Sequence, residues 1–383
     1  MAQVPLSVLD LIPVSSGSTN AEALRNTIDL ARQAEQFGYQ RYWFAEHHLN
    51  PGVIGASPAL AIAVVAAATS HIRLGSAGFQ LGHRTALSVV EEIGLLEALY
   101  PGRLDLGLGR SAGKPPANEP AAPAAASTGT GPAFNPSGSP VAGPDSGLVV
   151  PKRFSFEKLL GSPRIALQHR LLFLPGGQPQ PYAEQVGDIL TLLAGDFEFG
   201  GATGHASPGL GAAVELWILG SSAGESAQVA AANGLRFAAN YHVAPSNILE
   251  AVAAYRAAFR PSAELDSPYV SVSADVVVAE DDVSARELAA GYGPWVRSIR
   301  TAAGAIKFPT PAEAAELPWT DEDRELVADR LQTQFVGSPR TVAERLHQLQ
   351  EATDADELVI TTITHQHLDR VRSYQLLAKE WLG

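Results

Sequence analysis

The chain has 383 residues, and none of them is cysteine. That absence excludes disulfides, thiolate metal sites and a cysteine nucleophile. Basic residues are also few, because 27 Lys and Arg stand against 40 Asp and Glu, which gives a formal net charge of −13. A chain with this balance offers no basic face, so we expect no nucleic-acid partner.

Long apolar runs are missing as well. The longest one covers residues 59–68 and is too short to span a bilayer. The N-terminus has no basic segment followed by an apolar core, so no secretion signal is predicted. We therefore expect a cytoplasmic protein with no membrane association.

Several signatures of nucleotide and metal enzymes are absent too. The sequence contains no P-loop and no His-Glu-x-x-His pattern. The segment Gly107–Gly109 lacks the third glycine of a dinucleotide fingerprint, and is therefore weak evidence for such a site. We predict no metal site and no nicotinamide site.

Strand-like and helix-like segments, by contrast, alternate almost from end to end. Residues 20–37 are typical of the helices, because Thr19 and Glu22 have capping-box spacing and Gly38 ends the segment. A plausible helix follows each strand, which requires parallel strands, and eight such units predict one (β/α)8 TIM barrel over residues 1–383. The predicted strands cover residues 6–12, 39–45, 72–76, 104–108, 215–219, 236–240, 269–278 and 357–362.

One segment interrupts the alternation. Between residues 115 and 147, 21 of 33 residues are Pro, Ala or Gly, and no apolar periodicity remains. Such a segment buries too little apolar surface to offset its ordering entropy. We predict a flexible low-complexity insertion over residues 112–150, after the fourth strand. Because loops after barrel strands lie on the catalytic face, it would be either a lid or a tolerated surface insertion.

The second predicted strand ends in three titratable side chains. Glu46, His47 and His48 follow directly on the apolar run Tyr42–Ala45. The unperturbed pKa of histidine is nearest to neutrality, so a positioned imidazole can move protons at working pH. Many histidines near strand ends are ordinary polar caps. The residues at the ends of the neighbouring strands are needed to distinguish a catalytic histidine from such a cap.

The next three strands end in features that suit a phosphorylated ring. Small residues over 75–78 would let a flat ring approach the backbone. Arg110 follows the fourth strand, where its guanidinium could pair with a phosphate or form an ordinary salt bridge. Residues 220–226, Gly-Ser-Ser-Ala-Gly-Glu-Ser, suit an anion site or a plain serine N-cap. Together these ends predict a phosphate site between strands four and five, with space for a ring toward strands two and three.

Taken in order, these segments resemble the bacterial-luciferase-like flavin monooxygenases. The resemblance covers nearly the whole chain except the insertion. It rests on five segments, which are Tyr42–His48, Ile72–Gly78, Pro101–Arg110, Trp217–Ser222 and Phe335–Pro339.

The resemblance implies a barrel that binds FMN and uses the reduced cofactor to activate dioxygen at the flavin C4a position. His47 matches the family's catalytic histidine, with Glu46 beside it. The peptide between Ala77 and Gly78 falls where the family often has a cis bond under the ring. The cofactor-binding residues implied in this way are Ser76, Ala77, Gly78, Arg110, Ser221, Ser222, Ala223 and Ser226.

Two departures limit what the resemblance implies. Gly109 stands where luciferase has a cysteine near the flavin edge, so light emission does not follow. The long insertion departs from the compact family pattern and removes any basis for inferring the substrate from loop length.

The resulting hypothesis is an FMN-dependent monooxygenase acting on a small organic substrate and dioxygen. A separate flavin reductase would supply reduced FMN, His47 would act as acid or base, and Glu46 would orient it. The insertion and residues 301–311 would close a dry pocket. Two alternatives stay open: a deazaflavin-dependent enzyme that transfers hydride, and a flavin-binding protein without turnover.

A homodimer is also expected. Luciferase-like barrels commonly associate through outer helices, and the segment 57–70 is apolar on nearly every face. A helix of that kind must be covered, either by a second copy or by neighbouring helices of the same chain.

Overall fold

The computed structural model describes residues 3–110, 141–142, 147–155 and 157–383. Most of the predicted insertion therefore lies outside the described residues, which include only 141–142 and 147–150 of it. The predictions that the insertion is flexible and could act as a lid concern residues outside the described part of the chain.

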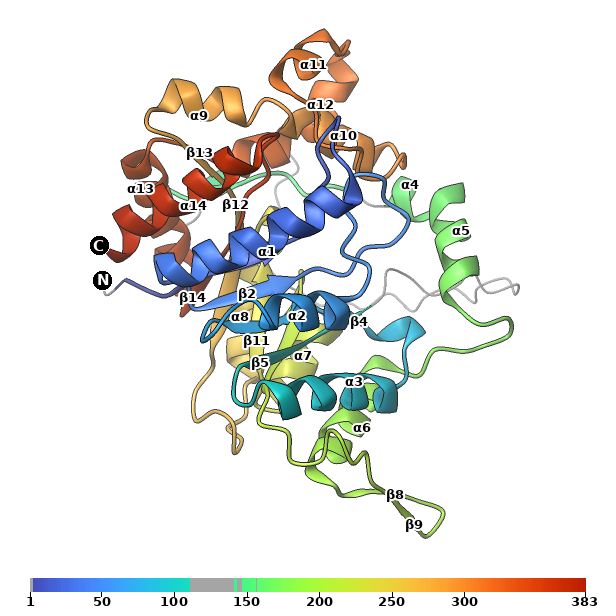
Figure 1. The fold of residues 1–383 in the computed structure, drawn as a ribbon. Helices are drawn as coiled ribbons and strands as arrows, with labels where there is room; N and C mark the ends of the chain where they lie inside the picture. The colour runs from blue at the N-terminus through green and yellow to red at the C-terminus, as the bar shows by residue number, and fades with distance from the viewer. Residues whose placement is uncertain (1–2, 111–140, 143–146, 156) are drawn as a thin grey trace.

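Eight parallel strands close into a barrel (Figure 1). Each strand pairs with the next one along the chain, β10 pairs with β5, and β14 returns to pair with β1. The predicted (β/α)8 barrel is thus confirmed. Its strands are β1 (Leu6–Asp10), β2 (Arg41–Phe44), β3 (Arg73–Ser76), β5 (Leu104–Gly109), β10 (Glu215–Gly220), β11 (Arg236–Asn240), β12 (Val270–Val278) and β14 (Glu357–Thr361).

The predicted strands differ from the observed ones only at their ends. The first strand, for example, stops at Asp10, because Ile12 adopts a left-handed φ of 53° that ends the extended backbone.

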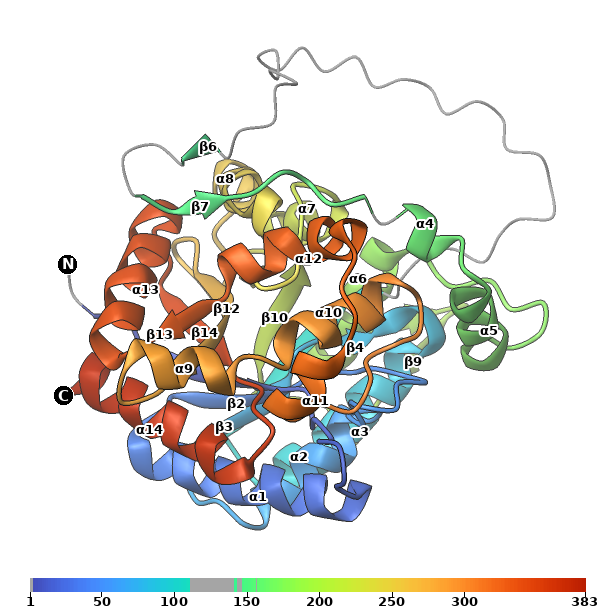
Figure 2. The same ribbon diagram turned by 90° about the horizontal axis from the view of Figure 1, so that it is seen from above.

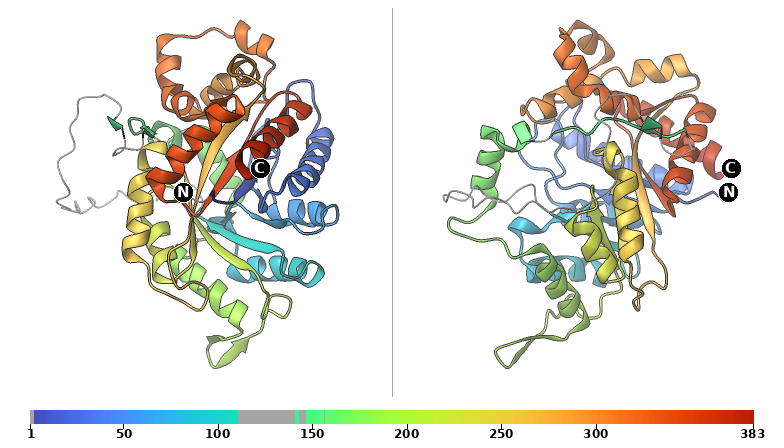
Figure 3. Two further views of the ribbon diagram at one scale, coloured as in Figure 1. Left: turned by 90° about the vertical axis from the view of Figure 1, so that its left-hand side faces the viewer. Right: turned by 180° about the vertical axis from the view of Figure 1, so that it is seen from behind.

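A helix on the outside of the barrel follows each strand (Figure 3). The first begins with the predicted capping box of Thr19 and Glu22 and ends at Gly38, which has a φ of 88°. The outer helices are α1 (Asn20–Phe37), α2 (Pro58–Ala66), α3 (Ala86–Leu99), α6 (Tyr182–Ala194), α7 (Glu225–Ala232), α8 (Ile248–Ala258), α13 (Pro339–Thr353) and α14 (His367–Leu382).

Smaller elements decorate the loops. The strand β4 (Phe79–Gln80) pairs with the end of β5, and β13 (Phe335–Gly337) pairs with β12. The others are the pair β6 (Val141–Ala142) and β7 (Val149–Val150), the pair β8 (Phe197–Phe199) and β9 (Ala202–Gly204), the helices α4 (Glu157–Leu160) and α5 (Pro163–Leu172), and the 3-10 turns η1 (Leu81–His83) and η2 (Pro245–Asn247).

A long excursion between β12 and β14 covers one end of the barrel. In Figures 1 and 2 its middle helices lie together above the carboxyl ends of the strands. They are α10 (Tyr292–Arg300), α11 (Pro311–Glu316) and α12 (Asp321–Thr333), and they follow α9 (Asp282–Leu288).

Paired charges fill the amino end of the lumen. The Arg41 guanidinium lies 3.0 Å from Asp105, 2.8 Å from Glu215 and 2.8 Å from Glu357. Arg73 adds a contact of 2.7 Å to Asp105. These groups come from five strands and satisfy one another, so this end of the lumen is closed and a ligand site belongs at the carboxyl end.

An apolar layer follows toward the carboxyl end. Trp43 and Trp217 meet edge to face with ring centroids 4.8 Å apart, and the Trp43 Nε1 donates to Asp105 below it at 2.8 Å. Trp295 of α10 and Phe308 belong to the same buried cluster. The excursion therefore packs directly on the lumen. Among the described residues, none of the helices is long and apolar enough to cross a membrane.

Candidate functional site

His47 stands at the carboxyl end of β2 and faces the lumen. It continues the inward series Arg41, Trp43 and Ala45, since alternate residues of a strand share one face. The pKa of His47 lies at about 4, mainly because burial lowers it; His48 adds to the shift and Glu46 opposes it. Its Nδ1 is buried and has no hydrogen-bond partner in the described part of the chain. The imidazole is thus neutral and keeps a nitrogen for a ligand.

Glu46 points the other way and does not bond to His47. Its carboxylate lies 3.0 Å from His48 Nε2 and 3.0 Å from His83 Nε2, and it accepts from the Gln80 N–H at 3.0 Å. Burial raises its pKa, but these bonds and Arg84 outweigh burial and lower it to about 2. Glu46 was expected to orient His47, but it cannot do so by direct contact. Consecutive strand residues face opposite sides, so the two side chains point apart.

The carboxylate of Glu46 instead ties the loop after β2 to the loop after β4. The ligand atoms of Glu46, His48 and His83 lie within 4.8 Å of one another, a grouping that could hold a metal ion. Arg84 Nε lies 3.6 Å from the same carboxylate oxygen and already supplies a positive charge there. His83 and Arg84 were not predicted as part of the site, because they follow a two-residue strand that is too short to be recognised from its pattern.

Residues 301–308 cover the ends of β1 and β2, as expected for the segment 301–311. Gly52 N–H donates to the Ala305 carbonyl at 2.8 Å, and Phe308 N–H donates to the Val14 carbonyl at 2.9 Å. The Asn50 side chain accepts from the Ala305 N–H at 2.9 Å. The loop that carries His47 is thus fastened to the excursion by backbone hydrogen bonds.

At the end of β3 the expected cis peptide is wrong, and the cofactor contact of Ser76 stays a prediction. The Ser76 hydroxyl donates to the Gly107 carbonyl at 2.7 Å and accepts from the Gly107 N–H at 3.0 Å, so this buried side chain joins two strands. The Ala77–Gly78 peptide is not cis, and the described residues contain no cis peptide bond. The chain turns here through a φ of 102° at Gly78, which glycine adopts without steric cost.

Ala77, Gly78 and Gly109 form the side-chain-poor surface that was expected beside β3. A Cβ added at Gly109 would lie 3.5 Å from the Gly78 Cα, an ordinary van der Waals distance. Packing within the chain therefore does not demand a glycine at 109. The surface is therefore open to contact with a flat ligand.

Arg110 and the start of α7 come together as predicted. Arg110 Nη1 lies 3.2 Å from the Glu225 carboxylate, and both side chains are nearly half exposed. Ser226, in the first turn of α7, is buried. The N-cap Gly224 makes no side-chain cap bond, so the first N–H groups of the helix remain available to an anion.

The other predicted phosphate contacts lie in the same turn. Ser222 accepts from the Gly224 N–H at 3.4 Å, and Ala223 is half-buried between them. Ser221 is exposed, and its carbonyl accepts from the Asn247 side chain at 3.0 Å.

Tyr182, which was not predicted as a site residue, also borders this turn. Its hydroxyl donates to the Leu108 carbonyl at 3.1 Å, and it is buried beside Ser226, Arg110 and Glu225. Burial raises its pKa, so it stays a neutral hydroxyl. A tyrosine at a helix start carries no signal of its own, because many such residues only fill a core.

Comparison with known proteins identifies the family. A model described as luciferase-like monooxygenase matches residues 4–126 and 188–356. The chain belongs to the luciferase-like monooxygenase family. It is 34% identical to YvbT of Bacillus subtilis (strain 168) over 98% of this chain and 96% of that protein. It is 30% identical to a luciferase-like monooxygenase of Escherichia coli (strain K12) over 99% and 98%.

Solved structures agree with this assignment. The crystal structure of apo-MsnO8 covers 99% of this chain and 98% of its own with a TM-score of 0.76 and 29% identity. The oxygenating constituent of 3,6-diketocamphane monooxygenase from Pseudomonas putida, solved with FMN, has a TM-score of 0.64 at 19% identity, over 99% and 97%. At that identity the likeness shows the fold alone.

Proteins that share this fold differ in the cofactor and substrate that their names record. An F420-dependent secondary alcohol dehydrogenase shares the fold with a TM-score of 0.60 at 12% identity, over 99% of both chains. An N-acetyl-S-alkylcysteine monooxygenase of B. subtilis is 44% identical over 110 residues, which are 29% of this chain and 33% of that enzyme. Family membership therefore does not specify the cofactor or the substrate, which depend on the residues at the mouth of the barrel.

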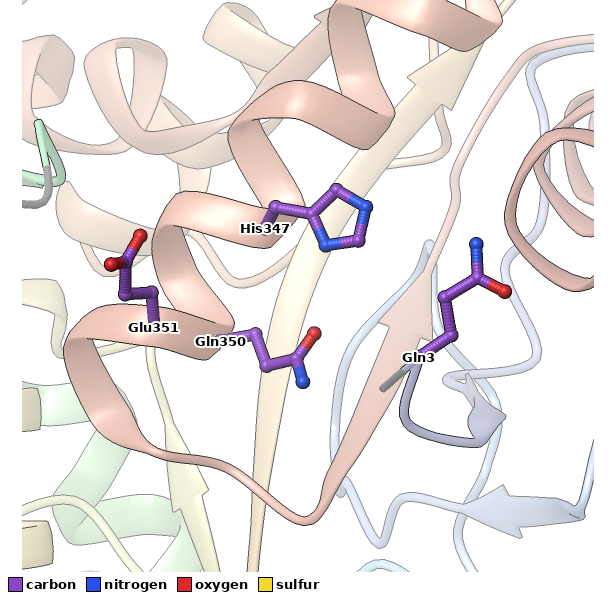
Figure 4. Close-up of a pocket in the computed structure, with 4 residues that line it drawn as sticks. All are labelled: Gln3, His347, Gln350 and Glu351. Atoms are coloured by element: carbon purple, nitrogen blue, oxygen red, sulfur yellow. The ribbon is translucent and has the colours of Figure 1, made fainter. Parts of the chain in front are cut away.

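A hollow of about 480 Å³ outside the barrel is not part of this site. Figure 4 shows its lining, from the carboxyl half of α13 and the segment before β1. It lies at the amino ends of the strands, opposite to His47. Its lining residues are Gln3, His347, Gln350 and Glu351.

Proposed function

We propose that this luciferase-like protein is the oxygenase of a two-component system that uses reduced FMN and dioxygen to oxidise a small, uncharged organic substrate. One observation carries the proposal. Among the described residues, the neutral imidazole of His47 has a buried nitrogen without a partner and opens on the same barrel mouth as Arg110 and Ser226.

The residues of the mouth fit FMN at both of its ends. Arg110, Ser226 and the open N-terminus of α7 would hold the phosphate by charge-assisted and backbone hydrogen bonds. Glu225 now pairs with Arg110 and would yield it to the phosphate. The surface of Ala77, Gly78 and Gly109 would lie against the ring. When bound, reduced FMN supplies two electrons, so that one oxygen atom of dioxygen enters the substrate and the other leaves as water.

His47 would work as a proton carrier beside the ring. Because burial lowers its pKa to about 4, it is neutral at working pH and can both accept and return a proton. Trp295, Phe308 and Ile306 border the same mouth and exclude water from it. Exclusion of water favours transfer of oxygen to the substrate over release of hydrogen peroxide.

A separate flavin reductase would deliver the reduced cofactor. The sequence carries no complete dinucleotide fingerprint for a nicotinamide site within this chain. The electrons must then arrive with FMN already reduced.

The oligomer we propose is a homodimer formed through α2 and α3. These adjacent helices expose Leu60, Val64, Leu95 and Leu99 to 70%, 52%, 60% and 70%. Exposed apolar side chains gathered on neighbouring helices mark an interaction surface, and a second copy presents the same apolar face.

The test is oxygen consumption with enzymatically reduced FMN, read together with product mass for a panel of aldehydes, ketones and thioethers. We expect an oxygenated product from the native enzyme, and from His47→Ala a yield lower by about 10²–10⁴-fold with FMN affinity unchanged. An equal loss of affinity and of product would make His47 a binding residue.

The same assay separates the deazaflavin alternative. Turnover that needs a reduced deazaflavin, proceeds without dioxygen and leaves no oxygen in the product would replace the proposal by hydride transfer. Binding of FMN with neither product nor oxygen uptake would favour a flavin-binding protein without turnover.

A further inference from the structure

A second imidazole lies across the mouth from His47. On β11 the inward residues are Arg236, Ala238 and Asn240, and the same alternation brings His242 inward beyond the end of the strand. β2 and β11 are the second and sixth of eight strands, so they form opposite walls of the barrel. On each strand the inward residues begin with an arginine near the amino end, Arg41 or Arg236, and end with a histidine at the mouth, His47 or His242.

Ser273 holds His242 in place. Its carbonyl accepts from the His242 backbone N–H at 3.1 Å, and its hydroxyl lies 2.5 Å from the His242 Nδ1. The other acceptors of that hydroxyl, the Ala239 carbonyl and the Asn240 side chain, are 3.4 and 3.5 Å away. The hydroxyl therefore donates to Nδ1, which assigns the ring proton of His242 to Nε2.

The neighbouring charges are paired with one another. Asp275, the next inward residue of β12, lies 2.9 Å from Arg330 Nη2 and accepts from the Tyr292 hydroxyl. Arg330 also donates to that hydroxyl at 2.7 Å. This buried group has no net charge. Thr361, level with Asp275 on β14, keeps a buried hydroxyl without a partner among the described residues, which marks this part of the mouth as a place for a polar ligand atom.

We propose that His242 is a second catalytic residue, which donates a hydrogen bond from Nε2 to the carbonyl oxygen of an uncharged substrate bound between it and His47. The inference rests on the proposed function, since it places the substrate of that reaction. A carbonyl oxygen accepts such a bond, and the paired charges of Asp275 and Arg330 beside His242 favour an aldehyde or ketone over a carboxylate.

The charge state of His242 agrees with this role. Its pKa lies at about 4, mainly because burial lowers it; the charge of Asp275 opposes the shift, and Arg330 and His47 add to it. At neutral pH the ring is therefore uncharged and has one N–H to donate.

The tautomer is the first test, and it needs no turnover. In the flavin-free protein labelled with ¹⁵N-histidine, long-range ¹⁵N–¹H correlation spectra distinguish the two neutral forms of each ring. We expect His242 to carry its proton on Nε2, with the signal assigned by its loss in His242→Gln. A proton on Nδ1 would overturn the inference whatever the enzyme's activity.

Two amide variants give the second test. The amide of His242→Gln places an N–H near the position of Nε2, whereas the amide of His242→Asn imitates Nδ1 and keeps the bond to Ser273. With octanal and cyclohexanone as probes, we expect His242→Gln to keep product yield within about threefold of the native enzyme and His242→Asn to lose about tenfold, the effect of one lost hydrogen bond.

The opposite order, or an equal loss in both variants, would show that His242 only supports β12. Melting temperatures and FMN affinities of both variants control for folding. A native enzyme that forms no oxygenated product would count against the proposed function, and the tautomer would still decide the placement of the ring proton.

Discussion

His47 and His242 are neutral imidazoles at the ends of opposite strands, and this neutrality is a property of their surroundings. For both rings burial lowers the pKa to about 4. An exposed histidine would be partly charged near pH 6.5 and would then repel other cations in the mouth. In both cases burial outweighs the nearby carboxylate, Glu46 for His47 and Asp275 for His242, so both rings stay uncharged.

Because the pKa of His47 is lower in the folded protein than in the unfolded chain, the free energy of unfolding depends on pH. The unfolded His47 binds a proton near pH 6.5 and the folded one near pH 4, so unfolding takes up about 0.9 of a proton at pH 5.5. The free energy of unfolding therefore falls as the pH drops through this window. We expect His47→Gln to flatten that slope between pH 6.5 and 4, as measured by urea denaturation at several pH values.

The matched control is His71→Gln, since the His71 side chain is 76% exposed. It should leave the slope close to that of the native protein. Equal slopes for the native protein and His47→Gln would show that the imidazole is as solvated when folded as when unfolded.

Arg110 is the residue on which phosphate binding depends most. We expect Arg110→Ala to weaken FMN affinity by about 1.5–3 kcal/mol, the usual worth of a hydrogen bond to a charged group. Quenching of flavin fluorescence measures the affinity. Arg340→Ala, which removes an exposed arginine paired with Glu344 on α13, should leave it unchanged. An unaltered affinity in Arg110→Ala would reduce Arg110 to a surface partner of Glu225.

At the scale of elements, the mouth depends on loops that are fastened to one another. The loop after β2 carries His47, and the segment 301–308 reaches it from the excursion between β12 and β14. Their backbones meet so closely that a Cβ on Gly52 would lie 1.7 Å from the Ile306 carbonyl oxygen. A side chain there must push the two segments apart.

Gly52→Ala should therefore loosen the cover of the mouth. We expect a loss of stability of about 1–3 kcal/mol and more hydrogen peroxide per dioxygen consumed, because water reaches the pocket. Thermal melting and a peroxide assay measure the two effects.

Gly187→Ala is the control, since a Cβ added at that position in α6 meets nothing within 4 Å. It should stabilise the helix by about 0.5–1 kcal/mol and leave peroxide release unchanged. Unaltered melting and peroxide in Gly52→Ala would mean that the two loops separate at no cost.

For the whole molecule, the exposed leucines of α2 and α3 predict its assembly. We expect light scattering at micromolar concentration to give a mass near twice the 40.2 kDa of one chain. Leu60→Glu together with Leu95→Glu should return it to one chain, because a charge buried at the interface is costly. Leu368→Glu on α14, where the residue is 77% exposed, should leave the dimer intact. A native protein that is monomeric would refute this interface.

The barrel itself could be predicted because its pattern is local. Each strand and each helix shows its own periodicity, caps and turns, as at Thr19, Glu22 and Gly38, and eight successive units leave few ways to pair the strands. For the same reason the ends of β2, β5 and β10 could be placed on one face, which brings Arg110 beside the turn before α7.

The side-chain partners could not be predicted, because they depend on residues distant in sequence. Glu46 contacts His83 instead of His47, and the Ser76 hydroxyl makes two hydrogen bonds to the Gly107 backbone. His242 follows its strand as His47 does, so the same signal was present in the sequence. That signal could be interpreted only once the closed barrel placed β11 opposite β2, and with it His242 opposite His47.

The sequence alone therefore determined the order of the elements, the face that carries the site and the family, since each follows from short-range patterns and motifs. The tertiary structure decided which groups are neutral, which are already paired and which remain open to a ligand. Those properties arise from burial and from contacts across the barrel, where the energies of polar groups depend on every neighbour and not on the residue alone.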